Sequence, residues 1–266
     1  MNGKKWITAA LLGSLSVFIL YSWQLSQPIF DEQLNDEQFR STLSIAPIEE
    51  ALTFATLRSG RVLLVTNANE NGVLAIELES GEGTAFADGI DAYHALGVQR
   101  LKTTAAERGT TAKLYPWEEL GVPVVENYPH IAAGTNYRAH AQEVGHVGEP
   151  FVFPKLSRAT VWNADVNNAA RLDYEVELCG VPLSKHTPTS TAKQGYILCG
   201  DYTDRWTLVK EIEIGAPMGP TGFASAKGGA TRLPVGPFLV IPNTEDFYQQ
   251  IQLQLYVNRD LRQRSS

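Results

Sequence analysis

Cysteine is scarce in this sequence: the chain has only Cys179 and Cys199, and they do not form a C-x-x-C pair. A zinc ribbon or a dithiol redox motif is therefore excluded, because both need closely spaced cysteines. Two cysteines pair only where their strands are neighbours at a suitable distance. Because both residues lie on apolar strands, we expect buried thiols rather than a disulfide.

Basic residues are also few, since 22 lysines and arginines stand against 29 aspartates and glutamates, and the net charge is −7. A nucleic-acid partner is not expected, because such a partner needs a basic surface. A complete phosphate-binding loop is missing too: residues 226–231 are glycine-rich and contain Lys227, but they do not complete the motif. The apolar content of 44% and charged content of 19% are typical of a globular protein. A chain of 266 residues has room for one large domain or two small ones.

One long hydrophobic run stands near the N-terminus. Residues 6–23 carry no charge and follow Lys4 and Lys5. This length is near the minimum for a membrane-spanning helix, and the lysines mark its cytoplasmic side. A cleavable signal peptide is the alternative, although residues 21–23 (YSW) form a poor cleavage site. We expect residues 1–26 to be an uncleaved signal anchor, so that the remainder of the chain lies outside the cytoplasm.

After a polar linker at residues 27–44, residues 45–125 are expected to form a small α+β subdomain. The expected elements are a helix over 45–56, strands at 61–66 and 73–78 that form a hairpin around the turn 67–72, and a helix over 88–108. This part of the sequence shows no catalytic pattern.

The most informative stretch is residues 172–178, LDYEVEL. As one strand, it would place its apolar side chains on one face and Asp173, Glu175 and Glu177 on the other. A half-buried strand with a solvated outer face explains this pattern equally well. Carboxylates two positions apart on a strand lie roughly 6.5 Å from each other and disfavour each other's ionisation. A hard divalent cation removes that conflict, so the stretch is a candidate metal site.

Further candidate residues lie on either side of this stretch. Residues 195–201 are typical of a buried strand that ends at Asp201, a common ligand position and also a common turn residue. His140 and Glu143 are three residues apart and share one face if this part is helical. Such a pair is more often a surface ion pair than a catalytic dyad.

Together these segments resemble the fumarylacetoacetate hydrolase family over residues 128–263. The landmarks are Asn136-Tyr137-x-x-His140-x-x-Glu143, Leu172-x-Tyr174-Glu175-x-Glu177-Leu178, Gly195-Tyr196 through Asp201, Lys227 with Thr231, Gly236-Pro237 and Val257-Asn258. The resemblance implies an α+β, mostly β mixed-sheet fold, with a catalytic domain at residues 126–266 and a homodimeric assembly. It also implies hydrolysis of a C–C bond in a 1,3-dicarbonyl acid of the acylpyruvate or fumarylacetoacetate type. Decarboxylation, isomerisation or hydration of related oxo acids is the alternative.

The resemblance also assigns roles to individual residues. It implies a Mg²⁺ ion, or Ca²⁺ or Mn²⁺, held by Glu175, Glu177 and Asp201. It implies a water-activating dyad of His140 and Glu143, with Lys227 stabilising the enolate that leaves. The residues implied to contact the substrate are Tyr137, Arg205 and Thr231.

Three features depart from the family pattern. Trp206 follows Arg205 where the family usually has aspartate, and the stretch from Asp201 to Lys227 is longer than in several compact members. The family also continues beyond the position that corresponds to Ser266, so the catalytic domain is expected to be incomplete. These departures keep a catalytically silent, membrane-tethered binding protein as an alternative. A carbohydrate-binding β module has only the strand pattern and the aromatic content in its favour.

Overall fold

The structure is a computed structural model that describes residues 16–17, 19–20, 44–80, 84–125, 130–137, 150–184, 192–211 and 220–265. The chain divides into two compact units, one of residues 40–255 and 263–266 and the other of residues 1–39 and 256–262. Within the smaller unit, residues 16–17 and 19–20 are helical, and residues 256–257 and 260–262 are extended. The larger unit holds the main sheet and the candidate site.

Most of the predicted membrane segment, residues 6–23, falls outside the described residues; only positions 16–17 and 19–20 belong to them. In the part of the chain that the structure describes, no helix combines the length and the apolar character needed to cross a membrane.

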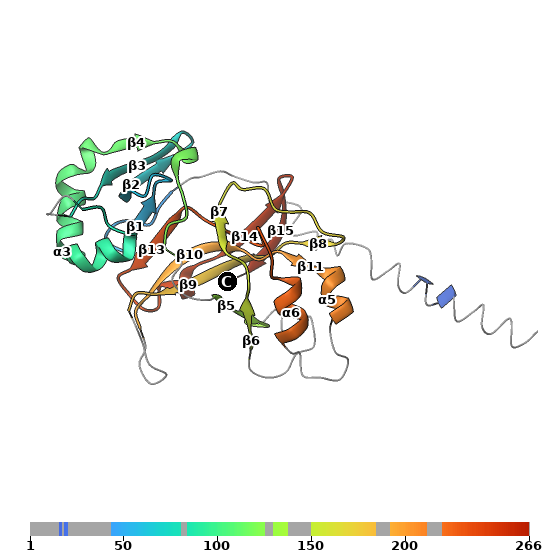
Figure 1. Cartoon of the computed structure of the whole chain (residues 1–266). Helices are drawn as coiled ribbons and strands as arrows, with labels where there is room; N and C mark the ends of the chain where they lie inside the picture. The colour runs from blue at the N-terminus through green and yellow to red at the C-terminus, as the bar shows by residue number, and fades with distance from the viewer. Residues whose placement is uncertain are drawn as a thin grey trace, which may run out of the picture. The chain divides into compact units, whose positions relative to one another are not determined.

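The main element is a nine-stranded mixed sheet (Figure 1). Its strands are β1 (Ala51–Thr56), β2 (Val62–Asn69), β3 (Gly72–Glu77), β4 (Lys113–Tyr115), β7 (Ala159–Val161), β9 (Val176–Pro182), β10 (Gln194–Gly200), β12 (Leu233–Val235) and β13 (Phe238–Pro242). The order is β4-β3-β2-β1-β13-β10-β12-β7, and β9 also pairs with β10. The β12–β7 pair is parallel, whereas the other pairs in the sheet are antiparallel. The predicted mixed sheet is therefore present, and β1 pairs directly with β13.

Shorter elements complete the described fold. Three two-stranded sheets pair β5 (His130–Gly134) with β6 (Phe151–Lys155), β8 (Leu172–Asp173) with β11 (Thr203–Asp204), and β14 (Leu253–Val257) with β15 (Asp260–Ser265). The α-helices are α3 (Gly89–Arg108), α5 (Arg205–Glu211) and α6 (Pro220–Ala226), and the 3₁₀ turns are η1 (Gly109–Thr111), η2 (Trp117–Glu119) and η3 (Phe247–Gln250).

The predicted hairpin at 61–78 is confirmed by the antiparallel pair β2–β3, whereas the predicted helix over 45–56 is wrong. Residues 51–56 are strand β1, and all six of them are buried. Leu52 and Phe54 belong to the core cluster on one face of the sheet, and Ala55 belongs to the cluster on the other face. A short apolar run buried on both faces has no alternating pattern, so periodicity alone did not identify this strand.

The predicted helix over 88–108 is confirmed as α3, which lies against β1 and β2 (Figure 1). Asp88 is its N-cap: the carboxylate accepts hydrogen bonds from the backbone N–H groups of Ile90 and Asp91 at 2.9 and 3.0 Å. Leu101 is fully buried and belongs to the same core cluster as Phe54. The helix therefore covers the face of the sheet that Phe54 occupies.

The acidic stretch 172–178 is not one continuous strand, and that prediction is wrong. The chain leaves β8 after Asp173 and enters β9 at Val176, because the two pieces pair with different partners, β11 and β10. At the break, the Asp173 carboxylate accepts a hydrogen bond from the N–H of Tyr174 at 2.9 Å. The carbonyl of Glu175 accepts one from the N–H of Asp201, also at 2.9 Å. The first bond is local to the break, and the second continues the pairing of β9 with β10 beyond the end of the two strands.

The predicted strand ending at Asp201 is confirmed: β10 ends at Gly200 and Asp201 follows directly. Strands β12 and β13 follow each other closely and are separated at Gly236 and Pro237. Proline has no N–H to donate, so the ladder is interrupted there.

The expectation of two buried thiols is wrong, because Cys179 and Cys199 form a disulfide. Their strands are antiparallel neighbours, in which Cys199 stands opposite Glu177 and Cys179 opposite Ile197. The two Cα atoms are 6.0 Å apart, which is within the range of disulfides. The bond joins β9, which contains Glu177, to β10, which Asp201 follows directly.

Candidate functional site

A cluster of acidic and basic side chains lies where β9 begins and β10 ends. Its members come from separate segments of the chain: Tyr137, Lys155 of β6, Asp173 of β8, Glu175, Glu177 of β9, Asp201, Arg205 of α5 and Lys227, which follows α6. Lys155, Asp201 and Lys227 are buried. Buried charges need partners, and each of these three has one within the cluster.

Lys227 forms ion pairs with two carboxylates of the cluster, Glu175 and Asp201. Its Nζ lies 2.6 Å from Glu175 Oε2 and 2.6 Å from Asp201 Oδ2. Burial lowers the pKa of Lys227, but the Asp201 and Glu175 carboxylates outweigh that effect, so the pKa is raised above its usual value. The lysine is therefore a permanent cation between two carboxylates.

Lys155 is a member of the site that the sequence did not identify. It is 5% exposed and forms an ion pair and hydrogen bond with Asp201 Oδ1. Burial lowers the pKa of Lys155, and Asp201 opposes that shift only in part. The sequence did contain one signal of its role: Lys155 ends an apolar segment, and a buried lysine needs a carboxylate partner. That partner is 46 residues away in the sequence.

Arg205 connects the two sides of the break in the acidic stretch. Its Nε donates to Asp173 Oδ2 and its Nη2 donates to Glu175 Oε1, both at 2.7 Å. Burial acts to lower the pKa of Arg205, and the bonds to Asp173 and Glu175 raise it overall. Arg205 thereby fixes the Glu175 carboxylate, whose second oxygen faces Lys227.

Glu177 is the most perturbed carboxylate in the cluster. Burial is the largest cause, and together with the charges of Glu175 and Asp201 it raises the pKa of Glu177 to about 7. A hydrogen bond with Tyr137 opposes that rise. Burial and the charge of Glu177 raise the pKa of Tyr137 in turn, so its phenol stays protonated and can donate.

The donor chemistry of the cluster suits a hard divalent cation, because the charges of Glu175, Glu177 and Asp201 act on one another. As the side chains stand, the described residues contain no group of three His, Cys, Asp or Glu arranged to hold a metal ion. The ammonium group of Lys227 lies between Glu175 and Asp201 instead. The three carboxylates that the sequence predicted as ligands therefore lie in one electrostatic cluster, with a lysine in contact with two of them.

The other predicted site residues differ in their placement. Tyr137, Arg205 and Lys227 belong to the cluster. The hydroxyl of Thr231 instead accepts a hydrogen bond from the N–H of Asn167 at 2.7 Å. His140 and Glu143 lie outside the described residues.

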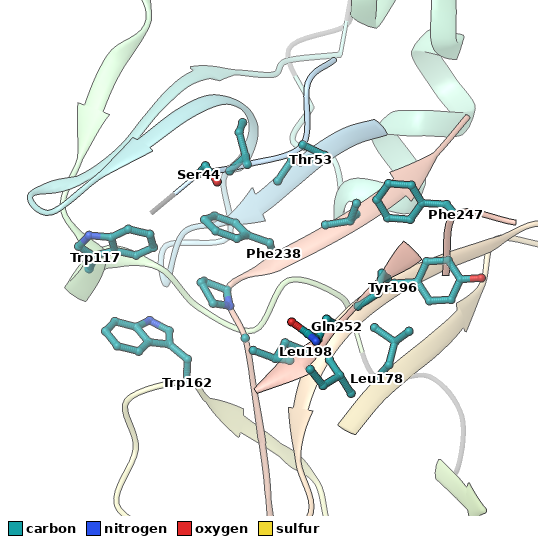
Figure 2. Close-up of a pocket in the computed structure, with 17 residues that line it drawn as sticks. Ser44, Thr53, Trp117, Trp162, Leu178, Tyr196, Leu198, Phe238, Phe247 and Gln252 are labelled. Carbon is teal, nitrogen blue, oxygen red and sulfur yellow. The ribbon is translucent and has the colours of Figure 1, made fainter. Parts of the chain in front are cut away.

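An apolar cavity of about 680 Å³ lies on the other face of β9 and β10 (Figure 2). Leu178 and Leu198 line it, and their strand neighbours Glu177 and Cys199 point to the opposite face. Its aromatic lining comes from Trp117, Trp162, Tyr196, Phe238 and Phe247. Among the described residues, no acidic or basic side chain lines this cavity. Of these two features, the charged cluster is therefore the one that contains acidic and basic side chains.

Comparison with known proteins gives one match of a family description, "Fumarylacetoacetate (FAA) hydrolase C-terminal", to residues 129–266. A 2,4-didehydro-3-deoxy-L-rhamnonate hydrolase from Sphingomonas sp. is 30% identical over 174 residues, which are 59% of this chain and 58% of that protein. The chain thus spans less than two thirds of the length of this curated relative.

Similar solved structures are more distant. A probable 2-hydroxyhepta-2,4-diene-1,7-dioate isomerase from Mycobacterium abscessus is 19% identical, with a TM-score of 0.48 over 81% of this chain and 73% of that one. A fumarylpyruvate hydrolase from Pseudomonas aeruginosa, in complex with Mn²⁺ and pyruvate, is 22% identical, with a TM-score of 0.39 over 52% of this chain and 64% of that one.

Proposed function

Because the chain belongs to the fumarylacetoacetate hydrolase family, we propose that it is a divalent-metal-dependent hydrolase that cleaves a C–C bond in a 1,3-dicarbonyl acid. One observation carries the proposal: Glu175, Glu177 and Asp201 cluster with Lys227 inside the residues that match the family. The names of similar proteins include both hydrolases and isomerases of oxo acids, which supports the substrate class more than the reaction.

Glu175, Glu177 and Asp201 would hold the cation, which would supply Lewis-acid polarisation of a substrate carbonyl. Arg205 holds one oxygen of Glu175 and so orients that carboxylate. In the reaction, Lys227 stabilises the negative charge on the leaving enolate oxygen. The buried position of Lys227 strengthens that interaction, because solvent screens it little.

The proposed proton transfers are assigned to His140 and Glu143. His140 takes a proton from water, and the hydroxide adds to the carbonyl carbon. The C–C bond then breaks, its electron pair goes to the leaving enolate, and the enolate carbon takes the proton from the imidazolium. Glu143 orients the imidazole and stabilises its charged form.

The test is turnover of an acylpyruvate by the full chain with added Mg²⁺ or Mn²⁺, followed by loss of the enol absorbance. We expect metal-dependent turnover that Asp201→Asn abolishes, whereas Asp246→Asn, at an exposed position, is a control that retains it. Metal-dependent release of carbon dioxide from oxaloacetate, without acylpyruvate hydrolysis, would identify a decarboxylase instead. Metal binding without any turnover would favour a binding protein on the same fold.

We also propose that residues 6–23 anchor the protein to a membrane, with the catalytic part outside the cytoplasm. The disulfide between Cys179 and Cys199 supports this location, because such bonds persist in oxidising compartments. Membrane fractionation followed by protease shaving tests it: recovery of a reduced species from the cytoplasm would contradict it.

We also propose that the protein is a homodimer, as the resemblance to the family implies. Light scattering of the detergent-solubilised protein tests this assembly.

A further inference from the structure

The Asp201 carboxylate contacts two ammonium groups, one at each oxygen. Lys155 binds Oδ1, and Lys227 binds Oδ2 at 2.6 Å. The backbone is held as well, because the N–H of Asp201 donates to the carbonyl of Glu175. Asp201 is therefore fixed in orientation, and its two oxygens have different surroundings.

The two lysines differ in what else they contact. Lys227 also binds Glu175 Oε2, so it lies between the two carboxylates on the side where they face each other. The described hydrogen bond of Lys155 is to the other oxygen of Asp201, Oδ1. Glu175 and Asp201 would hold a cation through their carboxylate oxygens, and Lys227 already contacts one oxygen of each.

Strand pairing and side-chain packing fix the position of Lys155. It ends β6, which is paired with β5 along its whole length. Phe153 of the same strand is 3% exposed and packs against Phe223 of α6, with 5.4 Å between the ring centroids. Because α6 leads into Lys227, one packed unit positions both ammonium groups.

We propose that Lys155 is a positioning residue that holds Asp201 for the divalent cation, whereas Lys227 competes with the cation for the carboxylates of Glu175 and Asp201. This inference rests on the proposed function, because it presupposes the metal site. Carboxylates that ligate metals are usually hydrogen-bonded by a further residue, and loss of that partner typically costs about 10- to 100-fold in metal affinity. Loss of Lys227 should have the opposite effect on metal affinity, because its ammonium group and the divalent cation compete for the same carboxylates.

Isothermal titration of the full chain with Mn²⁺ separates the two roles. Lys155→Met should weaken Mn²⁺ binding about 10- to 100-fold, and Lys155→Arg should restore part of the loss. Lys227→Met should bind Mn²⁺ at least as tightly as the wild type. Lys113→Met, at an exposed position on β4, is the matched control and should not change the affinity.

Thermal unfolding without metal shows whether each variant is folded, and Lys155→Gln, which retains a hydrogen-bond donor, replaces Lys155→Met if the latter does not fold. Wild-type affinity in Lys155→Met, or equal losses in Lys155→Met and Lys227→Met, would overturn this inference alone. Absence of Mn²⁺ binding by the wild type would overturn both this inference and the proposed metal-dependent function.

Discussion

Removal of the disulfide between Cys179 and Cys199 should destabilise the protein by about 3 kcal/mol. The two cysteines are 20 residues apart in the sequence, so the bond closes a loop of about that length in the unfolded chain. With the chain-entropy relation, a loop of about 20 residues loses about 11 cal/mol/K, which is about 3 kcal/mol at 25 °C. For a domain of this size, that loss corresponds to a decrease in Tm of about 6–12 °C.

The assay is urea unfolding of the wild type and of the double variant Cys179→Ala/Cys199→Ala, each with and without a reducing agent. We expect the reducing agent to lower the midpoint of the wild type to near that of the double variant. The double variant itself should not respond, which makes it the control for other effects of the reagent. The entropy argument is refuted if the oxidised wild type and the double variant unfold at the same midpoint.

The same experiment has a functional readout. The disulfide joins β9 to β10, which lead to Glu177 and Asp201. If the bond keeps these strands in register, the double variant should bind Mn²⁺ more weakly than the wild type under conditions in which both are folded. Equal affinity would restrict the role of the disulfide to stability.

The remaining predictions concern the proton transfer, the cation and the core. His140→Ala should lower acylpyruvate hydrolysis by about 10²- to 10⁴-fold without changing Mn²⁺ affinity, and wild-type turnover would remove His140 from the mechanism. Glu175→Ala should weaken Mn²⁺ binding in calorimetry, and turnover should partly recover at high metal concentration; if turnover does not respond to metal, Glu175 is not a ligand. Leu101→Ala, at a fully buried position, should cost about 2–5 kcal/mol in urea unfolding, whereas Leu114→Ala, at a 48% exposed position, should change stability by less than about 0.5 kcal/mol.

The parts of the fold that could be predicted from the sequence depend on local patterns. The hairpin β2–β3, helix α3 and strand β10 each have their own periodicity and end signals within a few residues. The N-cap at Asp88 is one such signal, since its partners are two and three residues away. Strand β1 had no such signal, because its apolar side chains are buried in a core cluster on each face of the sheet, and those clusters exist only in the folded chain.

The candidate site shows the same division between local and distant information. The alternating acidic stretch and the strand end at Asp201 marked candidate ligands, and the resemblance to the family assigned Glu175, Glu177 and Asp201 to the metal. The sequence did not identify Lys155, because the ion pair that explains a lysine on an apolar strand exists only in the folded chain. The disulfide escaped prediction for a related reason: the pairing of β9 with β10, rather than the apolar character of either strand, brings the cysteines together.

The break at Tyr174 and Glu175, where the strand partner changes from β11 to β10, also changes the electrostatic surroundings of the acidic stretch. In a single strand, Asp173, Glu175 and Glu177 would form one row of like charges with no partner specified. In the structure, Asp173 and Glu175 share Arg205, so the repulsion between these two carboxylates is offset. Glu177 has Tyr137 as its hydrogen-bonding partner, and its pKa is raised to about 7 by burial and then by the charges of Glu175 and Asp201. The strongest remaining conflict in the cluster is thus at Glu177, and a divalent cation shared by Glu175, Glu177 and Asp201 would relieve it.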